Sequence, residues 1–194
     1  MLSDTEIAEK TDQELVAQTL INKDSYRYLM VRYEAKLMRY IMRLIRVSRE
    51  DAEDILQEVF IKTYVNLNDF DPRLKFSSWI YRITHNEAMS HLRRLKTRPR
   101  TFDLEINEII VNKLRSDLDL EKIVDQNYLK KNIEKIISTI DKRYQDVIIL
   151  RYMEDRDYQE ISDILKKPMG TVAILLKRAK EQIKKNVVNN KIPF

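Results

Sequence analysis

The sequence predicts an all-α protein with two helical domains joined by a linker. It contains one glycine and four prolines in 194 residues, and such low numbers argue against the many tight turns of a β protein. Hydrophobic residues make up 43% and charged residues 35% of the chain, which is typical of long amphipathic helices around a core. Apolar residues also recur at three- and four-residue spacing in most segments, as expected for helices with one buried face.

These patterns divide the chain into four parts. We expect a helical domain over residues 1–96, a linker over 97–126, a helix-turn-helix domain over 127–188 and a short tail over 189–194. The linker is expected because its sequence turns acidic after a basic start. Its leucines and isoleucines could nevertheless form short docked helices.

Four helices are expected in the first domain. The first begins near Thr11 or Asp12, and the second covers residues 26–47. The third covers residues 51–67 and follows Ser48, which opens an S-x-x-D pattern that favours a helix start.

The fourth helix follows a polar loop over residues 66–75. It is expected to begin at Ser77 or Ser78 and to end at the basic residues 93–94. Trp79 in this helix is expected in the core, because its neighbours are isoleucines at core spacing.

The second domain is expected to begin with helices over residues 128–139 and 143–153. Residues 157–185 then predict a helix-turn-helix, with Asp157 in a capping box and Pro168 at the start of the second helix. Two short helices, each with one apolar stripe and joined by a tight turn, are what this motif requires. An ordinary pair of antiparallel helices is the alternative.

Positive charge gathers in two segments. Residues 73–100 and 166–191 each contain eight Lys or Arg residues and one Glu, a net charge of +7, whereas the whole chain carries +5. Two basic segments in an acidic background indicate two contacts with a polyanion. Two solvated faces are the alternative.

We predict that the protein is not an enzyme and binds no cofactor or metal. It has no cysteine, which excludes disulfides and thiolate chemistry. His85 and His91 match no metal-binding pattern, and the lone Gly170 excludes a glycine-rich phosphate loop. Acidic residues occur beside Lys and Arg at helical spacing, which favours surface ion pairs over acid–base catalysis.

A cytoplasmic location is expected. No apolar stretch approaches the roughly 20 residues of a membrane span, and residues 1–10 are acidic and polar, unlike a signal peptide. The absence of cysteine is consistent with a reducing compartment.

Four segments occur along nearly the whole chain in a characteristic order. They are Asp54-Ile-Leu-Gln-Glu-Val-Phe-Ile-Lys62, Phe76-Ser-Ser-Trp-Ile-Tyr-Arg-Ile-Thr-His-Asn86, Tyr158-Gln-Glu-Ile-Ser-Asp-Ile-Leu165 and Gly170-Thr-Val172. In this order they resemble the sigma-70 family, and the small two-domain size resembles its extracytoplasmic-function (ECF) group. The resemblance implies a protein that binds core RNA polymerase, recognises a promoter through its −10 and −35 elements and opens the duplex.

The resemblance implies that one face of the third helix binds a coiled coil in the β′ subunit of core polymerase. The residues concerned are Asp51, Asp54, Gln57, Glu58 and Lys62. The three acidic residues share a helix face opposite the apolar one. A plain solvated face is the alternative.

The fourth helix and the loop before it are implied to bind the −10 element and the displaced non-template strand. The residues concerned are Arg73, Lys75, Phe76, Ser77, Tyr81, Arg82 and Asn86. The cations would hold phosphates, while Phe76 and Tyr81 would stack on bases. Asn86 matches a pocket for a flipped base, where its amide can both donate and accept hydrogen bonds.

The helix-turn-helix domain is implied to bind the −35 element and the β flap of polymerase. The residues concerned are Pro168, Gly170, Thr171, Ala173, Ile174, Lys177, Arg178 and Lys180. The second helix is expected in the major groove, with its cations near phosphates.

Three positions depart from the family's pattern. The family usually has a basic-polar-basic run directly after Gly-Thr-Val, whereas this chain has Ala173, Ile174 and Leu175. Apolar side chains cannot form the hydrogen bonds that distinguish G or A. Three interpretations stay open: contact with thymine methyls in an A/T-rich element, weak −35 recognition with recruitment by a DNA-bound partner, or an apolar protein interface.

The expected partners are core RNA polymerase and promoter DNA, with no membrane partner. An anti-sigma factor or a DNA-bound recruiting protein are further candidates. The acidic linker either threads into the nucleic-acid channel of the polymerase or only tethers the domains. A helix-turn-helix regulator that does not bind polymerase is the alternative function, and a helical adaptor with no nucleic-acid role is a third.

Overall fold

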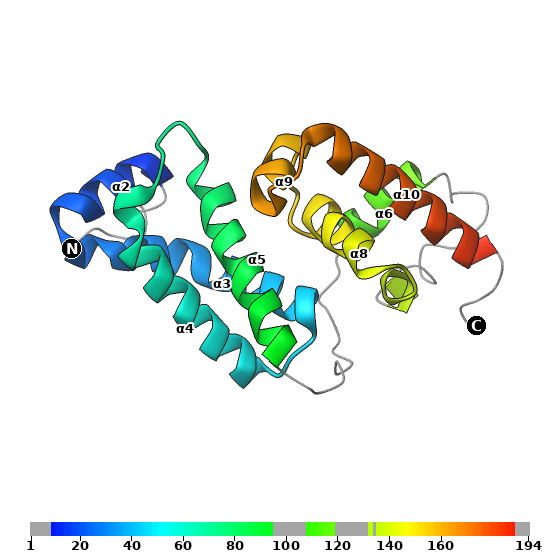
Figure 1. Ribbon diagram of the computed structural model, residues 1–194, viewed down its shortest axis with the longest axis horizontal. Coiled ribbons are helices and arrows are strands. Elements are labelled where there is room, and N and C mark those ends of the chain that lie inside the picture. Colours follow the sequence, from blue (N-terminus) through cyan, green and yellow to red (C-terminus); the bar gives the residue numbers. More distant parts are fainter. Residues whose placement is uncertain (1–8, 95–107, 119–131, 134, 189–194) are drawn as a thin grey trace. The chain divides into compact units, whose positions relative to one another are not determined.

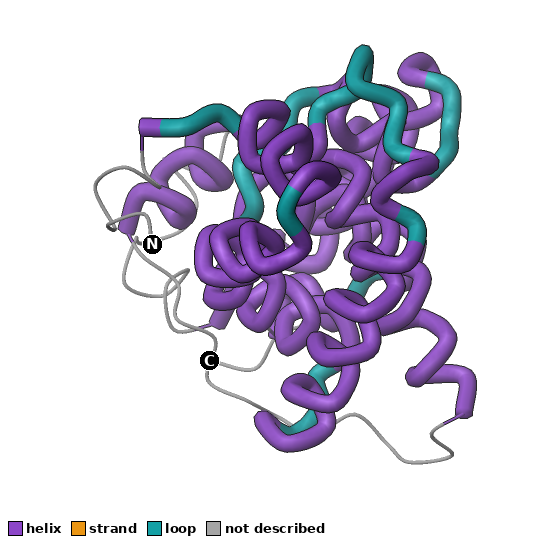
Figure 2. The backbone as a smooth tube through the Cα atoms, turned by 90° about the vertical axis from the view of Figure 1, so that its left-hand side faces the viewer, coloured by secondary structure: helices purple, strands orange, loops and turns teal. Residues whose placement is uncertain are grey.

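The computed structural model describes residues 9–94, 108–118, 132–133 and 135–188. Within these ranges every regular element is a helix (Figure 1), and Figure 2 shows the described chain as helices joined by loops. The chain forms two compact units, an N-terminal one that contains residues 9–94 and a C-terminal one that contains residues 108–118 and most of the residues after them. The predicted all-α fold with two domains is confirmed.

In the part of the N-terminal unit that is described, four α-helices are joined by short turns and, between the third and the fourth, by a longer loop. They are α2 (Asp12–Ile21), α3 (Tyr26–Ile45), α4 (Arg49–Val65) and α5 (Phe76–Arg94). Helices α3, α4 and α5 pack against one another, and α2 packs mainly on α3 (Figure 1). Each helix begins within two residues of its predicted start.

Side-chain caps explain two of these starts. Thr11 and Glu14 form a capping box, in which Thr11 Oγ1 accepts from the Glu14 N–H at 3.2 Å and Glu14 Oε2 accepts from the Thr11 N–H at 2.7 Å. Ser48 Oγ accepts from the Asp51 N–H at 3.1 Å. These bonds satisfy N–H groups that have no partner inside the helix. The S-x-x-D prediction for the start of α4 is therefore confirmed.

An aromatic cluster fixes the start of α5. Phe76 is fully buried, and its ring centroid lies 5.4 Å from Phe70, 5.6 Å from Tyr33 and 5.7 Å from Trp79. Edge-on and tilted rings at these distances attract one another beyond their simple burial. Because the cluster joins α3, the loop and α5, it determines which face of α5 is turned outward.

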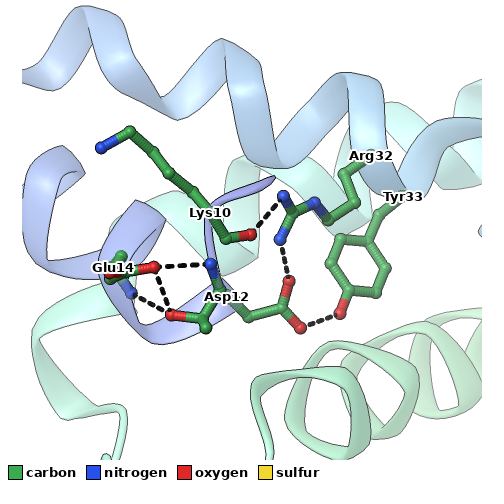
Figure 3. A network of polar contacts seen from close by, with 6 residues as sticks. Lys10, Asp12, Glu14, Arg32 and Tyr33 are labelled. Atoms are coloured by element: carbon green, nitrogen blue, oxygen red, sulfur yellow. Dashed lines mark hydrogen bonds and ion pairs between the residues drawn. The ribbon is translucent and has the colours of Figure 1, made fainter. Parts of the chain in front are cut away.

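A polar network holds the start of α2 on α3 (Figure 3). Asp12 accepts hydrogen bonds from the Arg32 guanidinium at 2.8 Å and from the Tyr33 hydroxyl. Arg32 also donates to the Lys10 carbonyl oxygen at 2.6 Å. The Arg32 and Asp12 side chains are only 16% and 22% exposed, so this charge-assisted contact is stronger than one on open surface.

The described part of the C-terminal unit contains α-helices and a π-helical segment. They are α6 (Glu108–Asp117), α8 (Lys142–Ile148), the π-helical η3 (Ile149–Met153), α9 (Tyr158–Leu165) and α10 (Met169–Val188). The helix predicted over 143–153 is thus divided into α8 and η3. Of the helix predicted over 128–139, the first residues lie outside the described ranges.

Helix α6 lies in the segment predicted as a linker and is docked on the C-terminal unit. Its apolar residues Val111 and Leu114, with Leu118 just beyond it, are at most 3% exposed. The Tyr152 hydroxyl donates to the Asp117 carboxylate at 2.7 Å, and burial together with this bond raises the pKa of Tyr152. For these residues the alternative of a docked helix in the linker is confirmed.

Helices α9 and α10 form the predicted helix-turn-helix. Asp157 Oδ1 accepts from the Glu160 N–H at 2.7 Å, and the Glu160 carboxylate accepts from the Asp157 N–H at 3.0 Å, which caps α9. Lys166, with a left-handed φ of 52°, ends α9, and the Pro168 carbonyl accepts from the Thr171 N–H at 2.8 Å as α10 begins. The inward-facing apolar residues are buried: Ile161, Ile164, Val172, Leu176, Ala179 and Ile183.

We predict that Asp12→Ala lowers the free energy of unfolding of the N-terminal unit by about 1–3 kcal/mol, because it removes the carboxylate that accepts from Arg32 and Tyr33. Urea unfolding followed by circular dichroism measures the change. Gln13→Ala, an exposed position in the same turn, is the matched control and should change stability by less than about 0.5 kcal/mol. Equal stability of the two variants would contradict the prediction.

Candidate nucleic-acid interface

The loop before α5 presents two of the predicted cations, Arg73 and Lys75. Arg73 Nε and Nη2 donate to the Asp71 carboxylate at 2.9 and 2.7 Å, and the Arg73 backbone N–H donates to it at 3.0 Å. These bonds, chiefly those from the Arg73 side chain, lower the pKa of Asp71 to about 2. Asp71 therefore stays ionised at neutral pH, and a phosphate would compete with it for Arg73.

One outward face of α5 carries Arg82 and Asn86. The two residues are four apart and so lie one above the other; Asn86 is exposed and Arg82 half-buried, as is Ser77 near the helix start. Arg93 continues this face seven residues after Asn86, is exposed, and donates to Ser90 Oγ at 3.1 Å. The sequence prediction did not include Arg93 in this surface, although its heptad spacing from Asn86 was a usable signal.

Phe76 and Tyr81 belong to the core, which corrects the stacking role predicted for them. Phe76 is 0% and Tyr81 1% exposed. The Tyr81 ring lies 5.0 Å from the Tyr40 ring, and Phe76 sits in the aromatic cluster. A ring enclosed in this way offers no face to a base, because the periodicity of α5 places both residues on its inner side. Trp79, at 7% exposed, is in the core as predicted.

The exposed face of α4 carries the predicted polymerase-binding residues Asp54, Gln57 and Glu58. Asp51 lies at the helix start and is half-buried, and its carboxylate accepts a hydrogen bond from the Ser48 hydroxyl at 2.6 Å. The acidic centre of the face is therefore Asp54 and Glu58.

Two apolar side chains extend this face of α4. Ile61 and Val65 are 63% and 68% exposed, and they follow Asp54 by seven and eleven residues, which places them on the same side of the helix. The sequence prediction missed both, although Ile61 falls outside the apolar stripe and so was detectable. The face thus combines carboxylates with apolar surface.

Two ion pairs join α4 to α5. Lys62 Nζ lies 2.7 Å from Glu87 Oε1, and Arg94 Nη2 lies 3.7 Å from Glu58 Oε2. The Glu87 side chain is only 10% exposed, whereas that of Lys62 is 52% exposed. Lys62, predicted to contact polymerase, therefore already has a partner on α5 in the free protein.

The outer surface of the helix-turn-helix is apolar at the first turn of α10 and basic around it. The exposed predicted residues are Pro168, Gly170, Thr171, Ala173, Ile174, Lys177 and Arg178, and Lys180 is half-buried. Lys166 and Lys167 in the turn are also exposed. Cations of this kind suit phosphate contacts.

Among the residues that the structure describes, no group of three or more His, Cys, Asp or Glu side chains could hold a metal ion. In the same ranges, no helix has the length and hydrophobicity needed to cross a membrane.

A helical bundle with a strip of cations and an amide, together with a basic helix-turn-helix, defines a class of helical DNA-binding protein. Residues 29–98 match the sigma-70 region 2 family model, and residues 130–183 match that of sigma-70 region 4. The chain is 30% identical to the ECF RNA polymerase sigma factor SigW of Bacillus subtilis, over 86% of this chain and 90% of SigW. It is 31% identical to the ECF RNA polymerase sigma-E factor of Haemophilus influenzae, over 91% of this chain and 95% of that protein. The chain belongs to the ECF group of the sigma-70 family.

Solved structures share the fold. CnrH, solved in complex with the cytosolic domain of CnrY, is 20% identical, with a TM-score of 0.66 over 93% of this chain and 99% of that chain. The sigma factor RpoE of Bartonella quintana, solved with the anti-sigma factor NepR, is 15% identical, with a TM-score of 0.57 over 84% of this chain and 96% of that chain.

We predict that Phe76→Leu lowers the free energy of unfolding by about 1–3 kcal/mol, because the ring is a core element. Below its unfolding transition, the variant should still open promoter DNA with core polymerase as the wild type does. Permanganate reactivity of unpaired thymines measures opening, and Asn86→Ala, an exposed change, is the control that should weaken it. Loss of opening by a fully folded Phe76→Leu would restore the stacking role.

Proposed function

We propose that this protein binds core RNA polymerase, directs it to promoters and helps to open the duplex, without catalytic chemistry of its own. In this proposal the N-terminal unit contacts polymerase and the −10 element, and the C-terminal unit contacts the −35 element and the β flap. The observation that carries it is a single packed helix pair with two different exposed faces: acidic and apolar on α4, basic with an amide on α5.

The acidic face of α4 suits a basic partner. Asp54 and Glu58 are exposed with Ile61 beside them, and such a mixed face fits the coiled coil of the β′ subunit. Carboxylates supply steering and register, while buried apolar area supplies most of the affinity. The sigma factors named among the relatives support this assignment.

The face of α5 suits an opened DNA strand. Asn86 is exposed and its amide can donate and accept, as reading a flipped base requires. Arg82 and Arg93 flank it on the same face and are placed to hold phosphates on either side. In this arrangement Asn86 contacts a base and supplies sequence specificity. The two arginines contact the phosphate backbone of the DNA and supply affinity.

The pairs Lys62–Glu87 and Glu58–Arg94 link these two faces. We infer that they keep α4 and α5 in one register, so that polymerase bound on α4 presents α5 to the promoter in a fixed orientation. Lys62 then acts from within the N-terminal unit rather than as a polymerase contact.

We assign the remaining features to the same role. The protein acts in the cytoplasm, where polymerase works, and the relative solved with an anti-sigma factor supports a regulatory partner of that class. The part of the linker described as α6 is docked on the C-terminal unit, which favours a tether over a threaded chain for those residues.

Gel filtration with core polymerase, followed by transcription from a promoter library, tests the proposal. Co-elution and transcription that depends on the added chain are the expected results. Failure to co-elute, even at low salt, would contradict the proposal. Tight sequence-specific binding of the free protein to duplex DNA would favour an independent regulator, because that function needs no polymerase.

We predict that Asp54→Lys weakens binding to core polymerase by at least tenfold, about 1.4 kcal/mol, because it places a cation in the acidic face. Titration of labelled protein with core polymerase, followed by fluorescence anisotropy, measures the affinity. Glu34→Lys is the matched control, since it makes the same charge change at an exposed position on α3, outside this face. Equal losses in both variants would indicate a net-charge effect and contradict a specific face.

A further inference from the structure

The centre of the outer face of α10 is apolar. The helix buries Val172, Leu176 and Ala179, and Ile174 follows Val172 by two residues, which turns it almost directly away from that stripe. Ile174 is 53% exposed, as is Met169 at the helix start. This position has no hydrogen-bonding group with which to distinguish base edges.

Gly170, one turn before Ile174, is the single glycine of the sequence. It lies in the first turn of α10, has no positive φ, and a Cβ built on it meets nothing within 4 Å. Glycine is among the least favourable residues within a helix, and neither backbone conformation nor packing requires it here. A binding partner whose surface approaches the backbone of α10 closely at this turn would explain the glycine.

Cations surround this apolar centre. Lys166 and Lys167 precede it in the turn, and Lys177 and Arg178 follow Ile174 by three and four residues, all exposed. A partner that fits is therefore anionic at its edges and apolar in its middle. The DNA major groove has this form where a thymine C5 methyl lies on its floor between phosphate walls. An entirely apolar protein surface would leave these four cations without an anionic partner.

We propose that Ile174 recognises thymine methyl groups in the upstream promoter element, and that the missing side chain at Gly170 lets α10 approach the bases closely enough for this contact. The inference rests on the proposed promoter-binding function and names what the helix-turn-helix reads. Ile174 is thus the specificity-determining residue of α10, while Lys177 and Arg178 contribute affinity that does not depend on sequence.

Replacing thymine by deoxyuridine tests the contact, because it removes only the methyl group. The holoenzyme first selects templates from a library with a randomised upstream element, and the preferred template is then synthesised with thymine or deoxyuridine in that element. We expect thymine at the selected positions and about a fourfold fall in transcription for each contacted methyl removed. Ile174→Ser should make the two templates equivalent, whereas the matched control Lys177→Ser should lower both and keep their ratio.

Several outcomes would overturn the inference. Selection of G or C at the contacted positions, equal use of both templates by the wild type, or no upstream preference at all would do so, and the last would indicate recruitment by a protein partner. If the holoenzyme does not form, or no template is transcribed, the proposed function itself fails.

Gly170→Ala tests the close approach separately. Because the added methyl meets open space in the free protein and alanine favours helices, the melting temperature should stay the same or rise. In the template comparison, the roughly fourfold loss of transcription for each removed methyl should nevertheless shrink toward no loss. Glu181→Ala, on the same side of α10 but three turns further along, is the control and should leave it unchanged. Full activity of Gly170→Ala, or a lower melting temperature, would overturn the role given to this glycine.

Discussion

The burial of one face of α5 is the constraint on which both surfaces of the N-terminal unit depend. Phe76 and Tyr81 are enclosed by rings from α3 and the preceding loop. Once they point inward, helical periodicity leaves Arg82 and Asn86 on the outside. The same rotation brings Glu87 beside Lys62 of α4. A single packed face therefore sets the position of the residues that we propose face DNA and their link to α4, which we propose faces polymerase.

The pair between Lys62 and Glu87 is informative because of its asymmetry. Glu87 is almost buried, while Lys62 is half-exposed, so the carboxylate bears most of the desolvation cost. Contacts of this type add little net stability, because the Coulomb gain is offset by that cost. They do penalise any sliding of α4 along α5, since a shift would leave Glu87 buried without its cation. We interpret the pair as a contact that fixes the position of α4 along α5 and adds little to the stability of the fold.

The sequence was sufficient where the information is local. Capping boxes at Thr11 and Asp157 and the apolar stripes of α9 and α10 depend on residues a few positions apart, so helix starts and the helix-turn-helix could be predicted. The burial of Phe76 could not, because an aromatic ring suits a base stack as well as a core, and only tertiary packing decides. The docking of α6 likewise depends on Tyr152, which lies far along the chain.

In the proposed function, the two surfaces that we assign to DNA divide affinity and specificity differently. On α5 an amide that both donates and accepts stands between arginines, whereas on α10 an aliphatic side chain stands among three lysines and an arginine. A good bidentate base contact discriminates by about 1–3 kcal/mol, and a single buried methyl contributes about 0.8 kcal/mol. Upstream discrimination built on methyl contacts is therefore the weaker of the two and needs several contacted thymines to match one amide contact. The surrounding cations add affinity for DNA but no discrimination between sequences. Because this added affinity arises from counterion release, it decreases as the salt concentration increases. In this proposal the upstream contact positions the polymerase, while the finer choice of promoter rests with the DNA strand bound by α5.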